Sequence, residues 1–405
     1  TPPKTSPSSD LKRLRTHTPP LAPSCQLQQE QPQCYLANLC PRSPRCIMAA
    51  TLCTRVHMRR FAARASIKDI ARRAGVSHST VSRALRGDRR ISAATAARIQ
   101  QVAAAVGYVP HAAARALVTC RSAVVGLVVT TLADPFVAEI VAGVEEAATP
   151  SGYSVLLATS ANEEQRELAV VRMLAERRVD GLIVTASRLG ERYGELLQKL
   201  GVPVVLINNQ AIGDYASSVR IDDFGGAKEL TAFLLSLGHR SLAFVGCPDR
   251  PRSHSLRRSG FEAACSELGP EEVCWQTLLP SGKDDLERGA CGLEMALKLR
   301  PRPTALVCYN DMTAIGALLS AREHGLNVPA AISIVGFDDI REATFVCPPL
   351  TTVHQPRREM GRSAFEMLQG LLAGQPGRDV LVPARLIVRS SAGPPACSAV
   401  QLHDR

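Results

Sequence analysis

Aromatic residues are scarce in this chain of 405 residues: they make up 4% of it, and only one is a tryptophan. No apolar run approaches the roughly 20 residues that a membrane-spanning helix needs, so we expect no membrane partner. The 13 cysteines include no pair spaced as CxxC. Because disulfide frameworks are typical of short secreted chains, we expect reduced cysteines in a cytoplasmic protein.

The sequence patterns of several large enzyme classes are also missing. There is no GxSxG, Walker A, GxGxxG or HExxH motif, and the nine histidines are scattered. Those motifs position a nucleophile, a phosphate, a dinucleotide or a zinc ion. His239 and His354 are therefore expected to be structural. The pattern favours a protein that binds rather than one that catalyses, without a cofactor or a metal.

Positive charge is concentrated in one short segment. The net charge is +11, and residues 58–118 carry 12 arginine and lysine residues against Asp69 and Asp88 alone. Residues 119–405 carry 29 basic and 33 acidic residues. A basic segment on a nearly neutral remainder indicates a polyanionic partner for that segment only.

The first 57 residues are rich in Pro, Ser and Gln and show no periodicity. We expect residues 1–63 to be a disordered extension, with Met58 as the natural start of the protein. Under this expectation the segment is upstream sequence translated from a misplaced start, and a disordered basic tail is one alternative. An organelle-targeting peptide is a weaker one, because prolines interrupt an amphipathic helix.

Residues 64–109 have the pattern of three short helices. Ser66, Ser77 and Ser92 each precede an apolar period and can cap a helix, and Gly75 permits the left-handed backbone of a tight turn. The residues expected on the buried faces are Ile67, Ile70, Ala71, Ala74, Val76, Val81, Ala84, Leu85, Ala96, Ile99, Val102, Ala103 and Val106. This predicts an all-α helix-turn-helix head.

Short polar side chains at the start of a second helix suit the base edges of the major groove. The candidates in the head are Ser77, His78, Ser79, Thr80, Ser82, Arg83 and Arg90. His78 and Ser79 are the best candidates for sequence readout, and Arg83 can contact guanine or phosphate. Arg90 is expected to contact the DNA backbone, as are its neighbouring arginines. The alternative for the arginines is a solvated helix face.

From residue 121 onward, apolar strands alternate with helical segments. The predicted strands are Val124–Val129, Ser154–Ser160, Gly181–Ser187, Val202–Asn208, Leu242–Cys247, Thr304–Asn310 and Ser333–Asp338. Such alternation is typical of parallel α/β sheets. Because nearly 270 residues are long for one sheet, we expect two Rossmann-like lobes. Ligands of such sheets bind beyond the carboxyl ends of the strands, so a crevice between the lobes is the expected pocket.

Several motifs in order give the chain a family resemblance. IKDIARRAGVSHSTVSRAL (67–85) and GYVPHAAARAL (107–117) resemble the lactose/galactose repressor family. The similarity continues as GHRSLAFVG (238–246), SGF (259–261), ISIVGFDD (332–339) and PPLTTVHQP (348–356). It covers nearly all of residues 64–390. The resemblance implies a ligand-responsive DNA-binding regulator whose body has the type I periplasmic-binding-protein fold.

The resemblance also implies a conditional hinge helix at residues 110–120. In such regulators this helix folds on operator DNA, and a leucine from each copy wedges into the minor groove. Leu117 matches that leucine, and Pro110, His111 and Arg115 are expected to assist. An apolar wedge costs a few kcal/mol of unstacking, which the contacts made on the bent DNA offset.

A second set of residues matches the family's effector site between the lobes. They are Asp134, Phe136, Asn208, Arg257, Asn310, Asp338 and Gln355. Polar groups in a closed cleft and an apolar face suit a sugar or a sugar derivative. Core packing of Phe136 and a turn cap by Asp338 are the alternatives, and Asp311 is expected to cap its helix. The loop PSGKDDLERG (280–289) lacks the aromatic residue of many sugar-responsive members, so a purine effector, or none, stays open.

We expect lobe one at about 121–220 plus 355–384, lobe two at about 221–354 plus 385–391, and a tail at 391–405. Because the tail has no leucine heptad, we expect a homodimer that binds a pseudo-palindromic operator. The most specific prediction is a cytoplasmic, nucleoid-associated bacterial repressor of a carbohydrate-utilisation operon. A secreted solute-binding protein is the alternative. It requires an apolar signal segment, which residues 1–57 do not offer, and it leaves the basic head unexplained.

Overall fold

The computed structural model describes residues 65–108, 121–189, 193, 201–211, 217–269 and 271–396. The chain divides into two compact units at residues 109 and 110. We call residues 65–108 the head and residues 121–396 the body. The predicted extension and the hinge residues Pro110, His111, Arg115 and Leu117 lie outside the described residues. No helix in the described ranges is long and apolar enough to cross a membrane.

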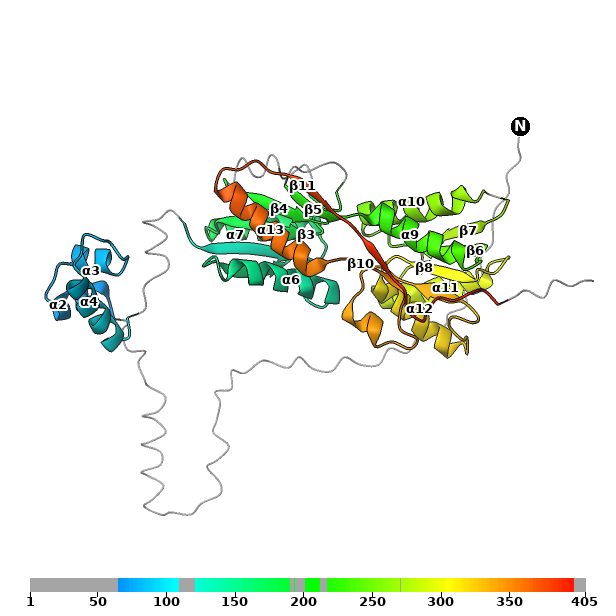
Figure 1. Ribbon diagram of the computed structural model, residues 1–405, viewed down its shortest axis with the longest axis horizontal. Helices are drawn as coiled ribbons and strands as arrows, with labels where there is room; N and C mark the ends of the chain where they lie inside the picture. The colour runs from blue at the N-terminus through cyan, green and yellow to red at the C-terminus, as the bar shows by residue number, and fades with distance from the viewer. Residues whose placement is uncertain are drawn as a thin grey trace, which may run out of the picture. The chain divides into compact units, whose positions relative to one another are not determined.

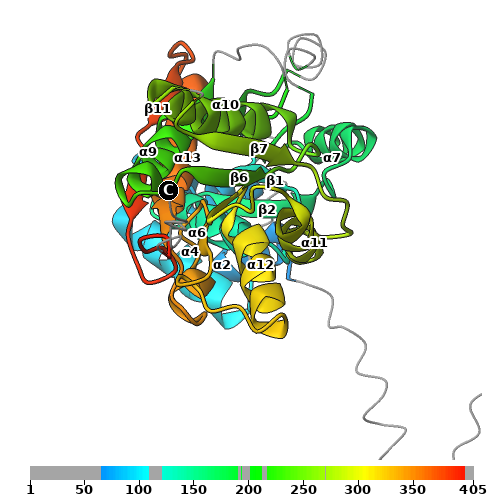
Figure 2. The ribbon, with the colours of Figure 1, turned by 90° about the vertical axis from the view of Figure 1, so that its right-hand side faces the viewer.

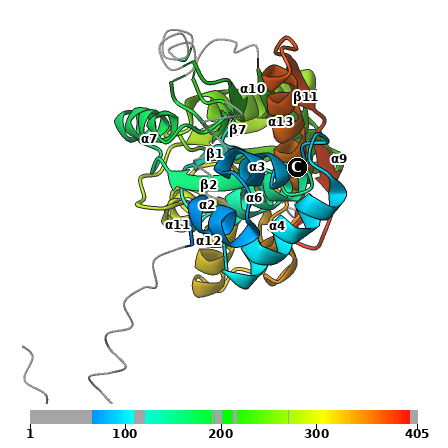
Figure 3. The ribbon, with the colours of Figure 1, turned by 90° about the vertical axis from the view of Figure 1, so that its left-hand side faces the viewer.

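The head consists of three short helices, α2 (Ile67–Ala74), α3 (His78–Ala84) and α4 (Ala93–Ala105) (Figure 3). Each begins after the predicted serine, whose hydroxyl accepts a hydrogen bond from the backbone N–H three residues later. Ser66 and Asp69 bond reciprocally as a capping box. Gly75 ends α2 in the left-handed conformation, with φ 64°. The helix-turn-helix prediction is confirmed.

One apolar cluster holds the three helices together. Ile70, Val81 and Ile99 are fully buried at its centre, and every residue predicted for the buried faces belongs to it. Ile91 and Tyr108, which were not predicted, also pack against it. Burial of these faces leaves the polar side of α3 at the surface.

Lobe one of the body is built on a six-stranded parallel sheet with the strand order β11-β5-β4-β3-β1-β2. The strands are β1 (Val124–Val129), β2 (Ser154–Thr159), β3 (Gly181–Thr185), β4 (Val204–Ile207), β5 (Ser218–Ile221) and β11 (Asp379–Val382). The helices α6 (Pro135–Ala148) and α13 (Arg357–Leu372) pack on one face, and α7 (Glu164–Glu176) packs on the other.

Lobe two has a four-stranded parallel sheet with the order β7-β6-β8-β9. The strands are β6 (Ser241–Val245), β7 (Cys274–Leu278), β8 (Ala305–Cys308) and β9 (Ser333–Val335). One face is covered by α9 (Asp223–Ser236) and α10 (Pro251–Glu267), as Figure 2 shows. The other is covered by α11 (Asp285–Lys298) and α12 (Asp311–Glu323). A 3₁₀ helix, η1 (Arg341–Thr344), follows β9.

The chain passes between the lobes three times, so the lobes are joined by neighbouring segments (Figure 1). β5 leads into α9, β10 (Thr352–His354) leads into α13, and β11 leads into β12 (Arg385–Ile387). β10 and β12 pair antiparallel as a two-stranded ribbon. All seven predicted strands are present, the first with its predicted bounds and the other six with shifted ends, and the prediction of two parallel α/β lobes is confirmed.

Contacts of lobe two extend past residue 391, where the tail was expected to start. Ser391 is fully buried in lobe two, where its hydroxyl donates to the carbonyl of Ile334 at 2.6 Å and accepts from the backbone N–H of Thr351 at 2.8 Å. The N–H of Gly393 donates to the hydroxyl of Ser333 at 3.1 Å. Lobe two therefore continues through residue 393, because backbone groups at its surface need these partners.

Candidate DNA interface and interlobe site

The exposed side of α3 carries the predicted base-reading residues. His78, Ser79 and Arg83 are exposed, and Ser82 is half-buried. Residues four apart lie on the same face of a helix, so positions 78, 79, 82 and 83 share one surface. No side-chain hydrogen bond ties His78 or Arg83 to another residue of the described head. These two side chains are available to a partner.

Ser77 and Thr80 are occupied within the helix start. The hydroxyl of Ser77 accepts from the backbone N–H of Thr80 at 3.1 Å and lies 2.8 Å from the Thr80 hydroxyl. It also lies 2.9 Å from the hydroxyl of Ser79. An N-cap of this kind stabilises the helix by about 1 kcal/mol. Ser77 and Thr80 therefore position the reading face.

Arg90 is held beside the loop that follows α3. Its Nε donates to Asp88 Oδ1 at 3.0 Å, and its terminal nitrogen donates to Asp88 Oδ2 at 2.7 Å. The hydrogen bonds from Arg90 lower the pKa of Asp88. The Arg90 side chain is still 77% exposed. It can approach a phosphate in a fixed orientation.

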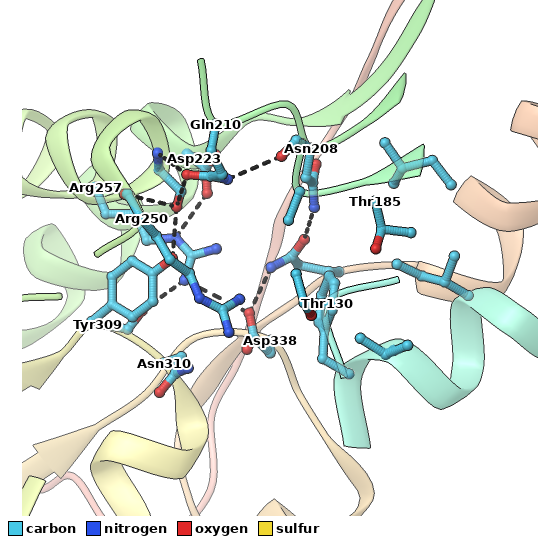
Figure 4. A pocket seen from close by; sticks show the side chains of 17 residues that line it. Thr130, Thr185, Asn208, Gln210, Asp223, Arg250, Arg257, Tyr309, Asn310 and Asp338 are labelled. Atoms are coloured by element: carbon cyan, nitrogen blue, oxygen red, sulfur yellow. Dashed lines mark hydrogen bonds and ion pairs between the residues drawn. The ribbon is translucent and has the colours of Figure 1, made fainter. Parts of the chain in front are cut away.

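In the body, six of the seven predicted effector residues meet at one cavity between the lobes (Figure 4). These are Phe136, Asn208, Arg257, Asn310, Asp338 and Gln355. The cavity has a volume of about 30 Å³, roughly the share of one water molecule in the liquid. Small-molecule sites usually measure about 300–1,000 Å³. The lobes must therefore separate, or the lining must rearrange, to admit a ligand here.

Arg257 is a buried cation that is paired through two of its nitrogens. Its Nε donates to Asp223 Oδ1 at 2.7 Å, and one terminal nitrogen donates to the carbonyl of Tyr309 at 2.7 Å. The same nitrogen lies 3.7 Å from Asp338 Oδ1, and the guanidinium sits 3.8 Å from the centre of the Phe337 ring. Asp223 and Tyr309 are therefore part of the site.

Gly260 explains how Arg257 reaches Asp223. A Cβ at Gly260 would lie 2.3 Å from the carbonyl oxygen of Phe224, so only glycine lets α10 approach the start of α9 this closely. Arg257 is one turn before Gly260 on α10, and Asp223 is the first residue of α9. The SGF motif thus positions the ion pair.

A chain of amide hydrogen bonds crosses from lobe one to lobe two. Asn208 Nδ2 donates to Gln355 Oε1 at 3.3 Å, and Gln355 Nε2 donates to Asp338 Oδ1 at 2.6 Å. Asn208 Oδ1 accepts from the backbone N–H of Ile221 at 3.1 Å. Burial raises the pKa of Asp338, and the nearby Arg257 guanidinium opposes that shift. The nitrogen and the oxygen of the Asn208 amide therefore both have hydrogen-bond partners within the protein.

A second polar link lies beside the first. The hydroxyl of Ser253 donates to Gln210 Oε1 at 3.0 Å and lies 2.6 Å from the Tyr309 hydroxyl. Gln210 Nε2 donates to the carbonyl of Asn208 at 3.0 Å. Burial raises the pKa of the Tyr309 phenol. These polar side chains of the lining thus bond to one another.

The cap of α12 differs from the expectation. Asn310, not Asp311, caps α12: its Oδ1 accepts from the Thr313 N–H at 2.9 Å, and its Nδ2 donates to Asp285 Oδ2 at 2.7 Å. The prediction for Asp311 is wrong, because its buried side chain accepts from the N–H of Ile340 at 2.9 Å. Asn310 has the extended backbone of a cap, with φ −146°.

Asp134 does not line the same cavity as the other predicted residues. It caps α6 by accepting from the N–H of Phe136 at 2.9 Å, and it borders a second cavity of about 410 Å³. That cavity lies between residues 131–135 and 162 of lobe one and the loops before α10 and α11 of lobe two. Arg250, which precedes α10, lines both cavities.

Sequence reasoning missed five lining residues whose side chains make hydrogen bonds or ion pairs in the site. They are Gln210, Asp223, Arg250, Ser253 and Tyr309. Asp223 had one usable signal, because a buried Arg257 requires a carboxylate partner. The others fall in loops or at helix starts without a local pattern. In the described part of the chain, no group of three or more His, Cys, Asp or Glu side chains is arranged to hold a metal ion.

Comparison with known proteins follows the same division into head and body. Residues 66–111 match the family model described as bacterial regulatory proteins, lacI family. Residues 231–392 match the periplasmic binding protein-like domain. The HTH-type transcriptional repressor PurR of Proteus mirabilis is 34% identical over 331 residues, which cover 81% of this chain and 96% of the relative.

The repressor CytR of Escherichia coli is 33% identical over 335 residues, covering 81% of this chain and 96% of the relative. Among solved structures, the lac repressor dimer bound to operator and the anti-inducer ONPF matches with a TM-score of 0.72 and 26% identity, covering 82% and 99% of the two chains. The CelR–cellobiose complex matches with a TM-score of 0.58 and 28% identity, covering 81% and 100%. The chain belongs to the lacI family of DNA-binding transcriptional regulators.

Proposed function

We propose that this regulator is a homodimeric repressor whose effector binds between the lobes and controls operator affinity. The observation that carries the proposal is the polar network from Asn208 through Gln355 to Asp338, which joins the two lobes of the body. A ligand that bonds to these side chains must replace the hydrogen bonds between them with hydrogen bonds to itself. It thereby shifts the population of lobe arrangements, one of which favours DNA binding.

In the head, we assign base contacts to His78, Ser79, Ser82 and Arg83. Ser77 and Thr80 hold the start of the helix that presents them. Arg90 and Arg115 are assigned to phosphates, and Leu117 to the minor groove. Two copies would place these sets on the two halves of a pseudo-palindrome.

In the body, the proposed effector contacts are Asp338, Asn208 and Gln355, with Arg257 holding Asp338 and Phe136 supplying an apolar face. Asn310 and Asp134 contribute through helix starts at the edge of the cleft. A carbohydrate derivative fits the density of polar groups. Because the relatives include PurR, a purine stays in the comparison. We also propose that the protein acts in the cytoplasm and binds its effector without converting it.

Replacing His78 with alanine should weaken operator binding by about 1–3 kcal/mol and relax base preference at one position of each half-site. The side chain is exposed on the reading face and has no competing partner in the described head. Arg89→Gln is the matched control, since a phosphate contact should weaken operator and scrambled DNA alike. Fluorescence anisotropy with duplexes varied one base pair at a time measures both. Unchanged base preference in the His78 variant would remove this assignment.

The central test uses DNA upstream of the gene that encodes the chain. Operator affinity of the full chain is measured with and without sugars, sugar derivatives, purines and nucleosides. We expect one of these compounds to change affinity by at least tenfold, and Asp338→Ala to abolish that change while keeping DNA binding. Arg362→Ala, on the exposed side of α13, is the control. Full effector response in the Asp338 variant would contradict the proposed site.

A further inference from the structure

Arg250 stands out as an incompletely paired cation between the lobes. Its side chain extends from the start of α10 toward Tyr309 and Asp338 (Figure 4). Its ion pair with Asp134 Oδ2 in lobe one has an N···O distance of 3.5 Å. A guanidinium carries five N–H donors, and a contact this long uses little of one.

The other cations nearby pair with carboxylates at shorter distances, although the Nε of Arg288 has no hydrogen-bond partner. Arg288 pairs with Asp285 Oδ1 at 2.6 Å and with Asp249 Oδ2 at 2.7 Å. Arg257 is paired as described above. The carboxylates beside Arg250 are also committed: Asp285 Oδ2 accepts from Asn310, and Asp134 Oδ1 accepts from a backbone N–H. Arg250 therefore keeps N–H donors that its single 3.5 Å contact does not use.

A second cation, Lys283, borders the same space. The larger cavity, of about 410 Å³, is lined by both Arg250 and Lys283 and has the size of a small-molecule site. The backbone N–H of Lys283 donates to Glu287 Oε2 at 2.8 Å, which holds the loop against the start of α11. The Lys283 side chain is exposed at the cavity rim.

The lining of this larger cavity indicates how a ligand would be held. Among the described residues it contains no aromatic side chain that could stack on a ligand ring. Its acidic residues are Asp134, Asp249, Asp284 and Asp285. Three of these, all except Asp249, accept hydrogen bonds from helix starts or from Asn310, and Asp249 pairs with Arg288. Their outer oxygens can still accept from ligand hydroxyls.

We propose that the effector is a small hydroxylated organic anion whose carboxylate or phosphate binds Arg250 and Lys283. This rests on the proposed function of the interlobe cleft. Oxyanion–guanidinium bonds are shorter and stronger than the 3.5 Å pair they would replace. The pair between Arg250 and Asp134 joins the two lobes. Replacing it with contacts to a ligand therefore shifts the balance between lobe arrangements.

The test uses matched sets of compounds and the full chain. Glucose, gluconate and glucose 6-phosphate form one set, and ribose, ribonate and ribose 5-phosphate form another. Calorimetry and thermal shift should show binding of an anionic member at least 30-fold tighter than the neutral sugar of its set. Comparing the sugar acids with the sugar phosphates shows which oxyanion binds more tightly. Arg250→Gln and Lys283→Gln should each weaken that binding at least tenfold.

Lys298→Gln, at the far end of α11, removes the same charge away from the cavity and should leave affinity unchanged. Circular dichroism and operator binding verify that the variants fold. Equal binding of neutral and anionic members, binding of none, or full affinity in the Arg250 variant would overturn the inference. A neutral sugar that releases the operator would overturn it while supporting the proposed function. An anion that binds through Arg250 without changing operator affinity would support the anion site and contradict the proposed control of operator binding.

Discussion

Replacing Arg257 with methionine should lower the free energy of unfolding of the body by about 3–5 kcal/mol, because breaking a buried ion pair leaves an uncompensated charge. The side chain is only 5% exposed, and its loss would strand the carboxylate of Asp223 and the carbonyl of Tyr309. Burial already raises the pKa of Asp223, and Arg257 opposes that shift. Urea denaturation of the full chain, followed by circular dichroism, measures the change.

Two further variants separate this explanation from a loss of packing. Arg257→Met combined with Asp223→Leu should recover most of the lost stability, since replacing both partners with apolar groups removes the unpaired charge. Arg358→Met removes an exposed arginine that pairs with Glu139 and Glu146, and it should cost at most about 1 kcal/mol. If Arg257→Met costs no more than Arg358→Met, the buried pair does not stabilise the body.

Leu117→Ala should weaken operator binding by about 2–3 kcal/mol, or roughly 30- to 150-fold, and leave non-specific binding nearly unchanged. The expected reason is loss of an apolar wedge, without which the unstacked step of the operator is not stabilised. Non-specific binding depends on phosphate contacts and does not require the kink. Anisotropy titrations on operator and scrambled duplexes at several salt concentrations measure the two affinities separately.

Arg115→Gln gives the contrasting result, because a phosphate contact should matter for both duplexes and should reduce the salt dependence by about one counterion. The two variants differ by two positions in the same segment, so a general disturbance of that segment would affect them alike. Equal losses on operator and scrambled DNA in the Leu117 variant would argue against the wedge.

Much of the head was predictable because its signals are local. Ser66, Ser77 and Ser92 each cap a helix by bonding to a backbone N–H three residues away. The apolar period then decides which side is buried. The long apolar strands of the body were predictable for a similar reason. β5, in contrast, is four residues long and includes Ser218 and Arg220, and it pairs both with β4 and with β11, which arrives from residue 379.

The site was less predictable than the fold. The family motifs brought Asn208, Asp338 and Gln355 to attention, and these residues do lie together. They could not show that Asp223 pairs with Arg257 from 34 residues away. Nor could they decide between Asn310 and Asp311 as the cap of α12, because both residue types favour that position and only the backbone conformation separates them.

The sequence by itself determined the class of protein: a basic three-helix head, an apolar pattern for two parallel sheets, and family motifs in order. These properties follow from periodicity and from bonds between near neighbours. Only the tertiary structure decided which polar side chains bond to one another and which retain donors, as Arg250 does beside Arg257. That division depends on burial and on partners that are distant in the sequence, and the free energy of a buried charge is set by those partners.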